Sequence, residues 1–261
     1  MNTHRFRICS IIIGLSVLSA GACAMSDETR ALFELNRMTA SSYYTAPSQV
    51  MLITALGKGD LQAAQKAIDQ GADTNAIGND GMTPLFWALG KQNLASVRFL
   101  LEHGANPNLI THWRNQAGLE QVASAPHLAA MMESTDFLRA VLDGGGDPNL
   151  VEDHRTKEAP IYPAILHQRR ANVDLLLQKG ADINHRNLSG ATPINYAVSA
   201  NHYSLALLLL KSGADPRIKD RWGYSAIDTT KKFGDRGVAN GSKDAAAYAE
   251  FIGELKRLGL W

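Results

Sequence analysis

Apolar residues in this chain gather in short clusters that recur along its length. Three examples are Val97 to Leu101, Leu175 to Leu177 and Leu207 to Leu210, and in each case a glycine stands three residues after the last apolar position. Such a run closed by glycine is typical of an amphipathic helix whose chain leaves through a left-handed residue. The pattern therefore predicts a set of similar helices, each ended by its glycine.

The glycines themselves are evenly spaced and carry a common sequence. Each is followed by Ala or Gly, then Asp or Asn, and in four of the five copies by Asn two positions later. The spacings between successive glycines are 33, 41, 35 and 33 residues. Five copies in register are not an accident of composition, so the chain is a tandem repeat in which no single copy buries its apolar face alone. The five glycines are Gly71, Gly104, Gly145, Gly180 and Gly213.

A second motif opens helices within the same period. Thr83-Pro84-Leu85 and Thr192-Pro193-Ile194 place a capping hydroxyl, worth ~1 kcal/mol, before a proline that has no N–H to leave unpaired. The two motifs together resemble the ankyrin repeat, whose period is near 33 residues and whose helix opens with T-P-L-H-x-A. This resemblance implies an all-α fold, an ankyrin-repeat solenoid of about six helix-turn-helix units with long hairpin loops.

The repeats place the domain boundaries. We expect a signal peptide at 1–22, a tether with a short helix at 23–46 and the repeat domain at 47–261. Terminal repeats are expected to be atypical because they cap the stack. An insertion, 109–123, lengthens one loop, and a second lies at 231–243. The expected repeats are about 47–78, 79–111, 120–153, 154–186, 187–219 and 220–261.

The first residues have the pattern of a secretory signal peptide. Two arginines precede an apolar run over residues 8–18, and small residues follow at 19–22. Ala20-Gly21-Ala22-Cys23 then resembles a bacterial lipobox, although Ala20 stands where leucine is preferred and ordinary signal peptidase would also accept these residues. Two alternatives stay open, and we favour a periplasmic lipoprotein anchored to the outer membrane through Cys23 over a free periplasmic protein. Residues 41–47 are expected to be linker.

Charge and motifs narrow the function. After removal of residues 1–22 the chain holds 24 Lys and Arg against 25 Asp and Glu, which is no footprint for nucleic acid. It has no nucleophile elbow, phosphate-binding glycine loop or histidine pair at metal spacing, so we expect no enzyme, no cofactor and no metal. His127 takes the motif position of its repeat and is expected to be structural.

The resemblance also implies where a partner would bind. Ankyrin repeats usually hold partners with the tips of their hairpin loops and the exposed side of their inner helices. Exposed methionines beside a leucine would suit an adaptable apolar contact, but the insertion at 109–123 could instead fold over and bury them, and both alternatives stay open. The positions carried over as partner-binding are Lys91, Trp113, Met131, Met132, Leu166, His167, Arg186 and Arg221.

These observations predict a monomeric protein-binding module of the periplasm that meets the membrane only through a lipid anchor. The expected partner is another protein, either a secreted toxin or a periplasmic enzyme. A concrete version is an immunity protein that neutralises a secreted antibacterial effector. The alternative is a helper or structural protein that supports another periplasmic enzyme or an envelope assembly.

Overall fold

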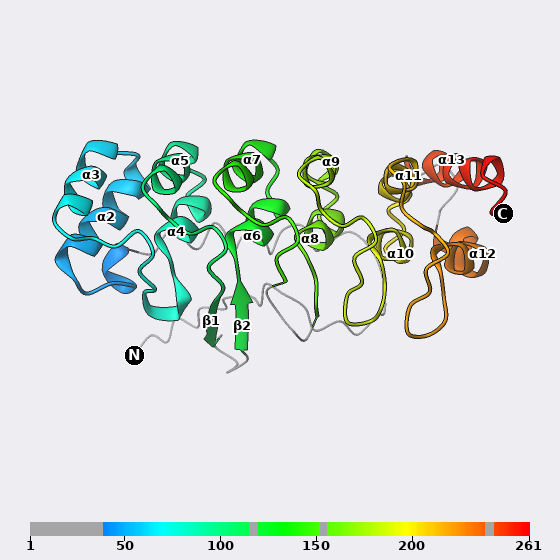
Figure 1. The fold of residues 1–261 in the computed structure, drawn as a ribbon, viewed down its shortest axis with the longest axis horizontal. Helices are drawn as coiled ribbons and strands as arrows, with labels where there is room; N and C mark the ends of the chain where they lie inside the picture. The colour runs from blue at the N-terminus through cyan, green and yellow to red at the C-terminus, as the bar shows by residue number, and fades with distance from the viewer. Residues whose placement is uncertain (1–38, 115–119, 152–155, 238–242) are drawn as a thin grey trace, which may run out of the picture. The chain divides into compact units, whose positions relative to one another are not determined.

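The computed structural model describes residues 39–114, 120–151, 156–237 and 243–261 (Figure 1). The expected signal peptide, its short following helix and Cys23 lie outside these ranges. The chain divides into two compact units. The first comprises Met1–Ala125 with Asp143–Gly146, and the second comprises Pro126–Leu142 with Asp147–Trp261.

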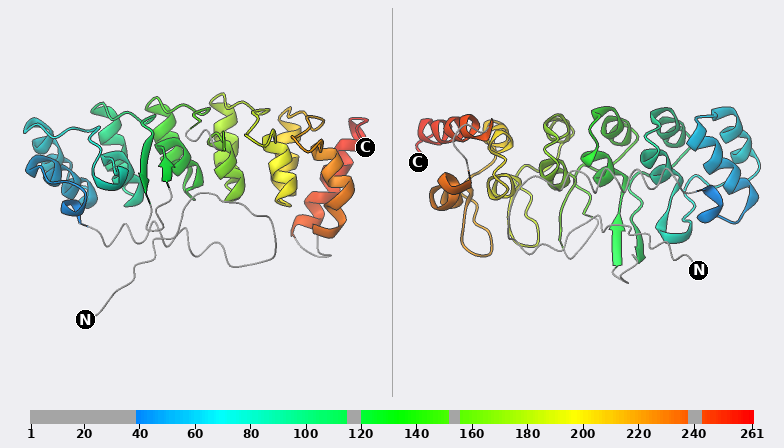
Figure 2. Two further views of the ribbon diagram at one scale, coloured as in Figure 1. Left: turned by 90° about the horizontal axis from the view of Figure 1, so that it is seen from below. Right: turned by 180° about the vertical axis from the view of Figure 1, so that it is seen from behind.

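Helix pairs build both units, as the repeat pattern predicts. Across the described ranges there are six pairs, and their inner and outer helices form separate rows within each unit (Figures 1 and 2). The inner helices are α2 (Pro47–Lys58), α4 (Pro84–Gly90), α6 (Ala125–Met131), α8 (Ile161–Leu166), α10 (Pro193–Ser199) and α12 (Ala226–Gly237). The outer helices are α3 (Leu61–Asp69), α5 (Leu94–Glu102), α7 (Thr135–Asp143), α9 (Arg170–Gln178), α11 (Tyr203–Lys211) and α13 (Lys243–Arg257).

The helix-start motif acts as expected. Thr83 precedes α4 in an extended conformation, and its hydroxyl accepts the Phe86 N–H at 3.2 Å. Thr192 does the same for the Asn195 N–H of α10 at 3.5 Å. The proline after each threonine occupies the first helical position, where its missing N–H removes no hydrogen bond.

The repeating glycines are left-handed, which confirms the predicted helix ends. Their φ angles are +86° (Gly71), +82° (Gly104), +93° (Gly145), +87° (Gly180) and +97° (Gly213). A Cβ built on any of them would meet no atom within 4 Å. The backbone conformation, rather than lack of space, therefore selects glycine here.

In four of the five copies, an asparagine four residues after the glycine links its repeat to the next one. Asn149 Nδ2 donates to Gly180 O at 2.9 Å, while Asn149 Oδ1 accepts the Asp182 N–H at 2.7 Å. In the last copy of the motif arginine replaces asparagine, and Arg217 instead pairs with Asp215 of its own turn at 2.8 Å. We call these asparagine bonds between neighbouring repeats the asparagine ladder. The arginine at position 217 ends this ladder where the array approaches its last repeat. Equivalent bonds to the following repeat come from Asn75, Asn108 and Asn184.

The insertion at 109–123 forms an antiparallel ribbon, which the sequence reading described only as a longer loop. Strand β1 (Thr111–Arg114) pairs with β2 (Glu120–Ala123), and Thr111 lies opposite Ala123. β-branched residues such as Thr111 and Val122, both buried, favour this conformation. The ribbon approaches the 3-10 helix η2 (Asn79–Gly81) so closely that a Cβ on Gly81 would lie 3.3 Å from Thr111 Oγ1.

The prediction that residues 41–47 form a linker is wrong for Tyr43 and Tyr44. The 3-10 helix η1 (Ala40–Ser42) leads into Tyr43 and Tyr44, and both rings are 6% exposed. The Tyr44 hydroxyl donates to Met82 O, and Asn79 N donates to Tyr43 O at 2.9 Å. An apolar ring with a polar tip can be buried in this way when the tip finds an acceptor. This segment therefore covers the first repeat rather than acting as a free tether.

Candidate functional site

The inner helices of the second compact unit carry the predicted apolar patch, but the patch is smaller than expected. Leu166 is 37% exposed at the end of α8, and Met131 and His167 are half-buried. Met132 is only 6% exposed, so its assignment to the partner-binding surface is wrong. Leu166 with part of Met131 remains as the exposed apolar area of this face.

Met132 lies in a turn that the next repeat holds in place. The helix ends at Met131, so Met132 belongs to the turn into α7 rather than to an exposed helix face. Side chains of the next outer helix then fasten that turn. Asn172 Nδ2 donates to Ala130 O at 3.0 Å and to Met132 O at 2.8 Å, and Arg169 Nε donates to Met131 O at 2.8 Å. Three carbonyls at the helix end are thereby paired, and Met132 forms part of the packing between repeats.

Lys91 lies in the first compact unit and packs on a tryptophan. Its ammonium is 4.5 Å from the centre of the Trp87 ring, and the loss of solvent around it lowers the pKa of Lys91. Trp87 is buried, with the Tyr43 ring edge-on at 5.9 Å. Gly57 leaves room for the indole, because a Cβ there would lie 3.1 Å from Trp87 Nε1. Lys91 is thus held against an aromatic cluster by a cation–π contact.

The structure describes little or nothing of two other predicted site residues, Trp113 and Cys23. Trp113 stands in β1 with its backbone paired to Gln121, and its side chain is outside the described part of the structure. Cys23 is outside it altogether. Whether the insertion contributes an aromatic anchor therefore stays a prediction.

Arg186 and Arg221 lie on two neighbouring loops of the second compact unit. We call these loops fingers, the first running over residues 179–192 between α9 and α10 and the second over 212–225 between α11 and α12. The backbone N–H of Arg221 donates to Ser189 O at 2.9 Å, and Arg186 Nη2 donates to Lys219 O at 3.0 Å. Both arginines are exposed. The structure therefore brings these two predicted residues onto one surface.

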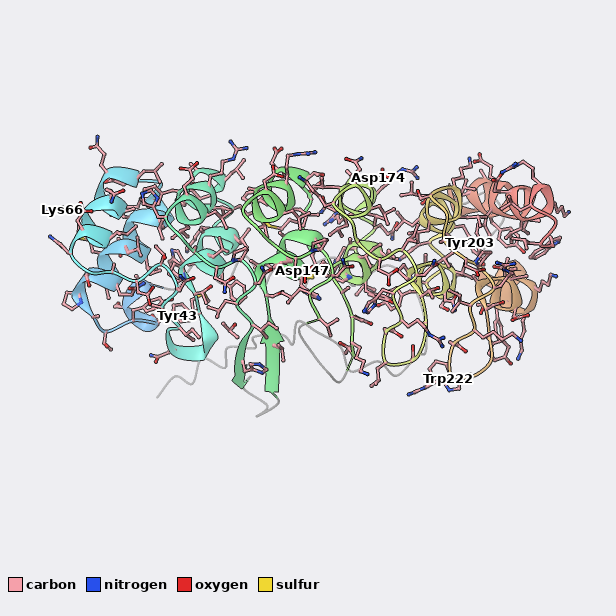
Figure 3. The ribbon with its side chains drawn as sticks, in the orientation of Figure 1. Tyr43, Lys66, Asp147, Asp174, Tyr203 and Trp222 are labelled. Carbon is pink, nitrogen blue, oxygen red and sulfur yellow. The ribbon has the colours of Figure 1, made fainter. Side chains whose placement is uncertain are left out.

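The finger surface also holds two exposed apolar side chains, of which Trp222 was not among the tip positions that the family resemblance implied. Leu188 in the first finger is 48% exposed, and Trp222 in the second is 61% exposed at the loop tip (Figure 3). The Arg221 guanidinium stacks on the Trp222 ring at 4.3 Å. Trp222 lies between Asp220 and Gly223, two residues that favour turns. This pattern in the sequence could have predicted that the tryptophan stands at a loop tip. We name Arg186, Leu188, Lys219, Arg221 and Trp222 the finger edge.

In three inner helices of the second compact unit, the same position is hydrogen-bonded to the loop of the following repeat. In three successive repeats this position holds His127, Tyr162 and Asn195. His127 Nε2 lies 3.0 Å from Glu158 O, the Tyr162 hydroxyl donates to His185 O at 2.8 Å, and Asn195 Nδ2 donates to Ile218 O at 3.0 Å. Different side chains thus make the same link between repeats.

Burial perturbs the titration of these groups. It lowers the pKa of His127 to about 4, and it raises the pKa of Tyr162. A histidine that is neutral at physiological pH and bonded to backbone serves the fold, as expected for His127. Within the described ranges no three His, Cys, Asp or Glu side chains come together in a way that could hold a metal ion.

Comparison with known proteins identifies the repeats. Family models of ankyrin repeats match residues 24–111 and residues 176–229. Protein PhlB of Serratia liquefaciens is 31% identical over 192 residues, which cover 73% of this chain and 80% of PhlB. The chain belongs to the ankyrin-repeat family. Ankyrin repeats bind other proteins, and their fold is typically a scaffold without catalytic activity.

Other ankyrin proteins match over a smaller share of their length. Human Ankyrin repeat and SOCS box protein 16 is 28% identical over 211 residues, which are 77% of this chain and 43% of that protein. An ankyrin repeat protein of Acanthamoeba polyphaga mimivirus, L371, is 28% identical over 159 residues, or 60% of this chain and 19% of its own. The chain thus spans less than half of these two relatives.

Solved structures confirm the predicted fold. The ankyrin repeat domain of Bcl-3 superposes with a TM-score of 0.63 at 26% identity, covering 78% of this chain and 85% of that domain. An ankyrin repeat domain from Acinetobacter baumannii AYE gives a TM-score of 0.62 at 24% identity, covering 80% and 97%. The chain is therefore an all-α ankyrin solenoid, with the ribbon of β1 and β2 as a local addition.

Proposed function

We propose that this chain is a periplasmic immunity protein that binds and neutralises a secreted antibacterial effector. The observation that carries the proposal is an ankyrin-repeat array preceded by residues with the pattern of a secretory signal peptide. An exported binding scaffold needs a partner in the envelope. An effector that enters this compartment is a partner whose neutralisation requires binding alone.

The proposal includes attachment to the outer membrane through a lipidated Cys23. Its support is the position of this cysteine after a small-residue cleavage site. No helix in the described ranges is both long and apolar enough to cross a membrane. A single acyl chain binds membranes only weakly, so stable anchoring requires more than one chain on this residue.

Self-intoxication tests the immunity role directly. A strain lacking the gene is grown on a surface with its parent, and its survival is measured against that of a complemented strain. We expect the deletion strain to be killed by the parent and rescued by the full-length gene, but not by a version without residues 1–22. Equal survival of the deletion strain and its parent would contradict the immunity role.

The lipid anchor needs its own test. Cys23→Ser should abolish labelling by an alkyne fatty acid and move the protein out of the membrane fraction. Labelling and fractionation like those of the wild type would contradict the anchor. A soluble but protective Cys23→Ser protein would leave the immunity role standing with the chain free in the periplasm.

A helper role is the alternative outcome of the same deletion. If the chain supports another periplasmic enzyme or an envelope assembly, its loss should reduce that activity or weaken the envelope in pure culture, in the absence of a competing parent. The alternative and the immunity role are thus separated by whether the defect requires contact with the parent.

A further inference from the structure

The finger edge of the second compact unit combines exposed apolar surface with positive charge. Among the exposed large apolar side chains in the described ranges, Trp222 has the largest exposed fraction, 61%. Leu188 of the adjacent finger is 48% exposed. Tryptophan and arginine are the residues that most often dominate the energy of a protein interface. A tip with both, at 4.3 Å from each other, is a surface suited to an apolar anchor beside a charged contact.

The charge around this edge is one-sided. Residues 186–233 contain seven Lys and Arg against three Asp, with no Glu, and the start of the first finger adds one of each sign, Lys179 and Asp182. Each of the three carboxylates has a local role. Asp215 pairs with Arg217, Asp220 accepts the N–H groups of Trp222 and Tyr224, and Asp228 accepts from the Ser225 hydroxyl and backbone.

The cations of the edge are left available. Arg186, Lys219 and Arg221 have no carboxylate within ion-pair distance in the described part of the chain. Asp228 is one opposing charge that faces the edge, and its pKa is lowered chiefly by Ser225 and to a smaller degree by Lys219 and Lys231. The field at the edge is therefore positive, and only partly offset at Lys219.

The edge is also built in advance of binding. Three hydrogen bonds join the fingers, from the Arg221 N–H to Ser189 O, from the Arg186 guanidinium to Lys219 O and from the Asp215 N–H to Asn184 Oδ1. Asp220 fixes the tip by accepting the Trp222 and Tyr224 amides, both at 2.9 Å. A surface ordered beforehand loses less entropy on association, so its contacts contribute more of their energy to affinity.

We infer that the finger edge docks an acidic segment of the partner protein, with carboxylates on Lys219 and Arg221 and an apolar side chain on Trp222. The inference rests on the proposed protein-binding function and names the chemistry of the partner. The guanidinium fork matches a carboxylate in two hydrogen bonds, which favours Asp or Glu. Trp222, whose ring lies 4.3 Å from the Arg221 guanidinium, supplies the apolar contact beside these cations.

Site-specific photocrosslinking in the cells that make the protein tests this placement. The photoreactive residue p-benzoylphenylalanine replaces Trp222 or Leu188 on the edge, Leu166 on the inner helices, or Ile77, which is 58% exposed in the first compact unit. Crosslinked peptides are sequenced by mass spectrometry. We expect protein adducts at positions 222 and 188 and none at 77, with at least two Asp or Glu close to the crosslinked residue.

A charge reversal then tests the cations. Arg221→Glu should reduce the adduct at position 188 about tenfold, and should weaken binding of the synthetic crosslinked peptide by a similar factor that shrinks as salt rises. Arg139→Glu, at an exposed position of α7, is the matched control and should change neither quantity. The thermal melting curves of both variants should match the wild type, since both side chains are exposed.

The possible failures are distinguishable. If protein adducts form only at position 166, the inference is overturned but protein binding stands. The same holds if adducts form at position 188 or 222 but the crosslinked peptide contains no Asp or Glu. Lipid adducts at position 222 would replace the protein segment with a membrane surface and would also overturn it. No protein adduct at any position would contradict the inference and the proposed function together.

Discussion

The asparagine ladder allows a quantitative test of what holds successive repeats together. In the second compact unit, Asn149→Ala removes the bond from Asn149 Nδ2 to Gly180 O at 2.9 Å and the bond from Asp182 N to Asn149 Oδ1 at 2.7 Å. Each neutral hydrogen bond contributes a net ~0.5–1.5 kcal/mol. Gly180 and Asp182 are exposed, so water can reach the groups left unpaired. We therefore expect a loss of about 1–2 kcal/mol rather than the cost of buried unsatisfied groups.

The same ladder supplies graded controls. Asn184 accepts one bond, from Asp215 N at 2.9 Å, so Asn184→Ala should cost about half as much as the change at Asn149. Arg217 occupies the matching position of the last copy and pairs only with Asp215 of its own turn, so Arg217→Ala should have little effect. Asn149→Asp keeps an acceptor for the Asp182 N–H but places a carboxylate against Gly180 O, and it should not restore stability.

Urea denaturation followed by far-ultraviolet circular dichroism measures these differences. The slope of the free energy against urea should be unchanged, which would show that the variants unfold to the same extent. The order of loss should be Asn149→Ala, then Asn184→Ala, then Arg217→Ala. Equal losses at all three positions, or none at Asn149, would refute the argument that side-chain bonds between neighbouring loops stabilise this array.

Three further predictions concern the helix ends, the buried histidine and the interior methionine. Gly180→Ala should destabilise the protein by about 1 kcal/mol because the φ angle of Gly180 is +87°. Gly253→Ala in α13, where a Cβ would meet open space, should be neutral or stabilising. Shifts of the melting temperature in the same direction for both variants would contradict this prediction. Burial lowers the pKa of His127 to about 4 in the folded state, against 6.5 for the solvent-exposed histidine of the unfolded chain, so the unfolded chain binds more protons between these pH values. The free energy of unfolding should therefore fall by roughly 3 kcal/mol as pH drops from 6.5 to 4. If the urea midpoint of a His127→Gln protein falls as steeply with pH as that of the wild type, His127 is not the group responsible. Met132→Glu should lower the free energy of unfolding by roughly 3 kcal/mol or more because it buries a carboxylate, while Leu166→Glu should melt near the wild-type temperature. A lower melting temperature for Leu166→Glu than for Met132→Glu, measured by circular dichroism, would show that the burial of these two side chains is misassigned.

Local rules in the sequence were enough to predict the repeat architecture. A left-handed glycine ends a helix and a threonine followed by proline begins one, for reasons confined to a few neighbouring residues. The periodic copies at Gly104 and Gly180, and the caps at Thr83 and Thr192, therefore had the predicted conformations. The family and its usual role in binding proteins followed from the same short motifs.

Residues where local patterning competes with packing were harder to predict. Met132 shares its place after an inner helix with the half-buried Lys91 and His167, but its own side chain is interior, and Asn172 of the next repeat fastens the turn. The tyrosines at 43 and 44 looked like linker, because their hydrogen-bond partners, Asn79 and Met82, lie more than thirty residues away. Such contacts are long-range, and no periodicity within one segment reports them.

The sequence by itself thus determined the repeat period, the helix starts and ends, and the presence of cations at Arg186 and Arg221. Only the tertiary structure decided which side chains share a surface. It placed Arg186 and Arg221, which lie on different fingers, on a common edge by hydrogen-bonding the two loops together. The physical reason is that the free energy of a repeat array resides in the packing between neighbours, so exposure at any position depends on the repeat that follows it.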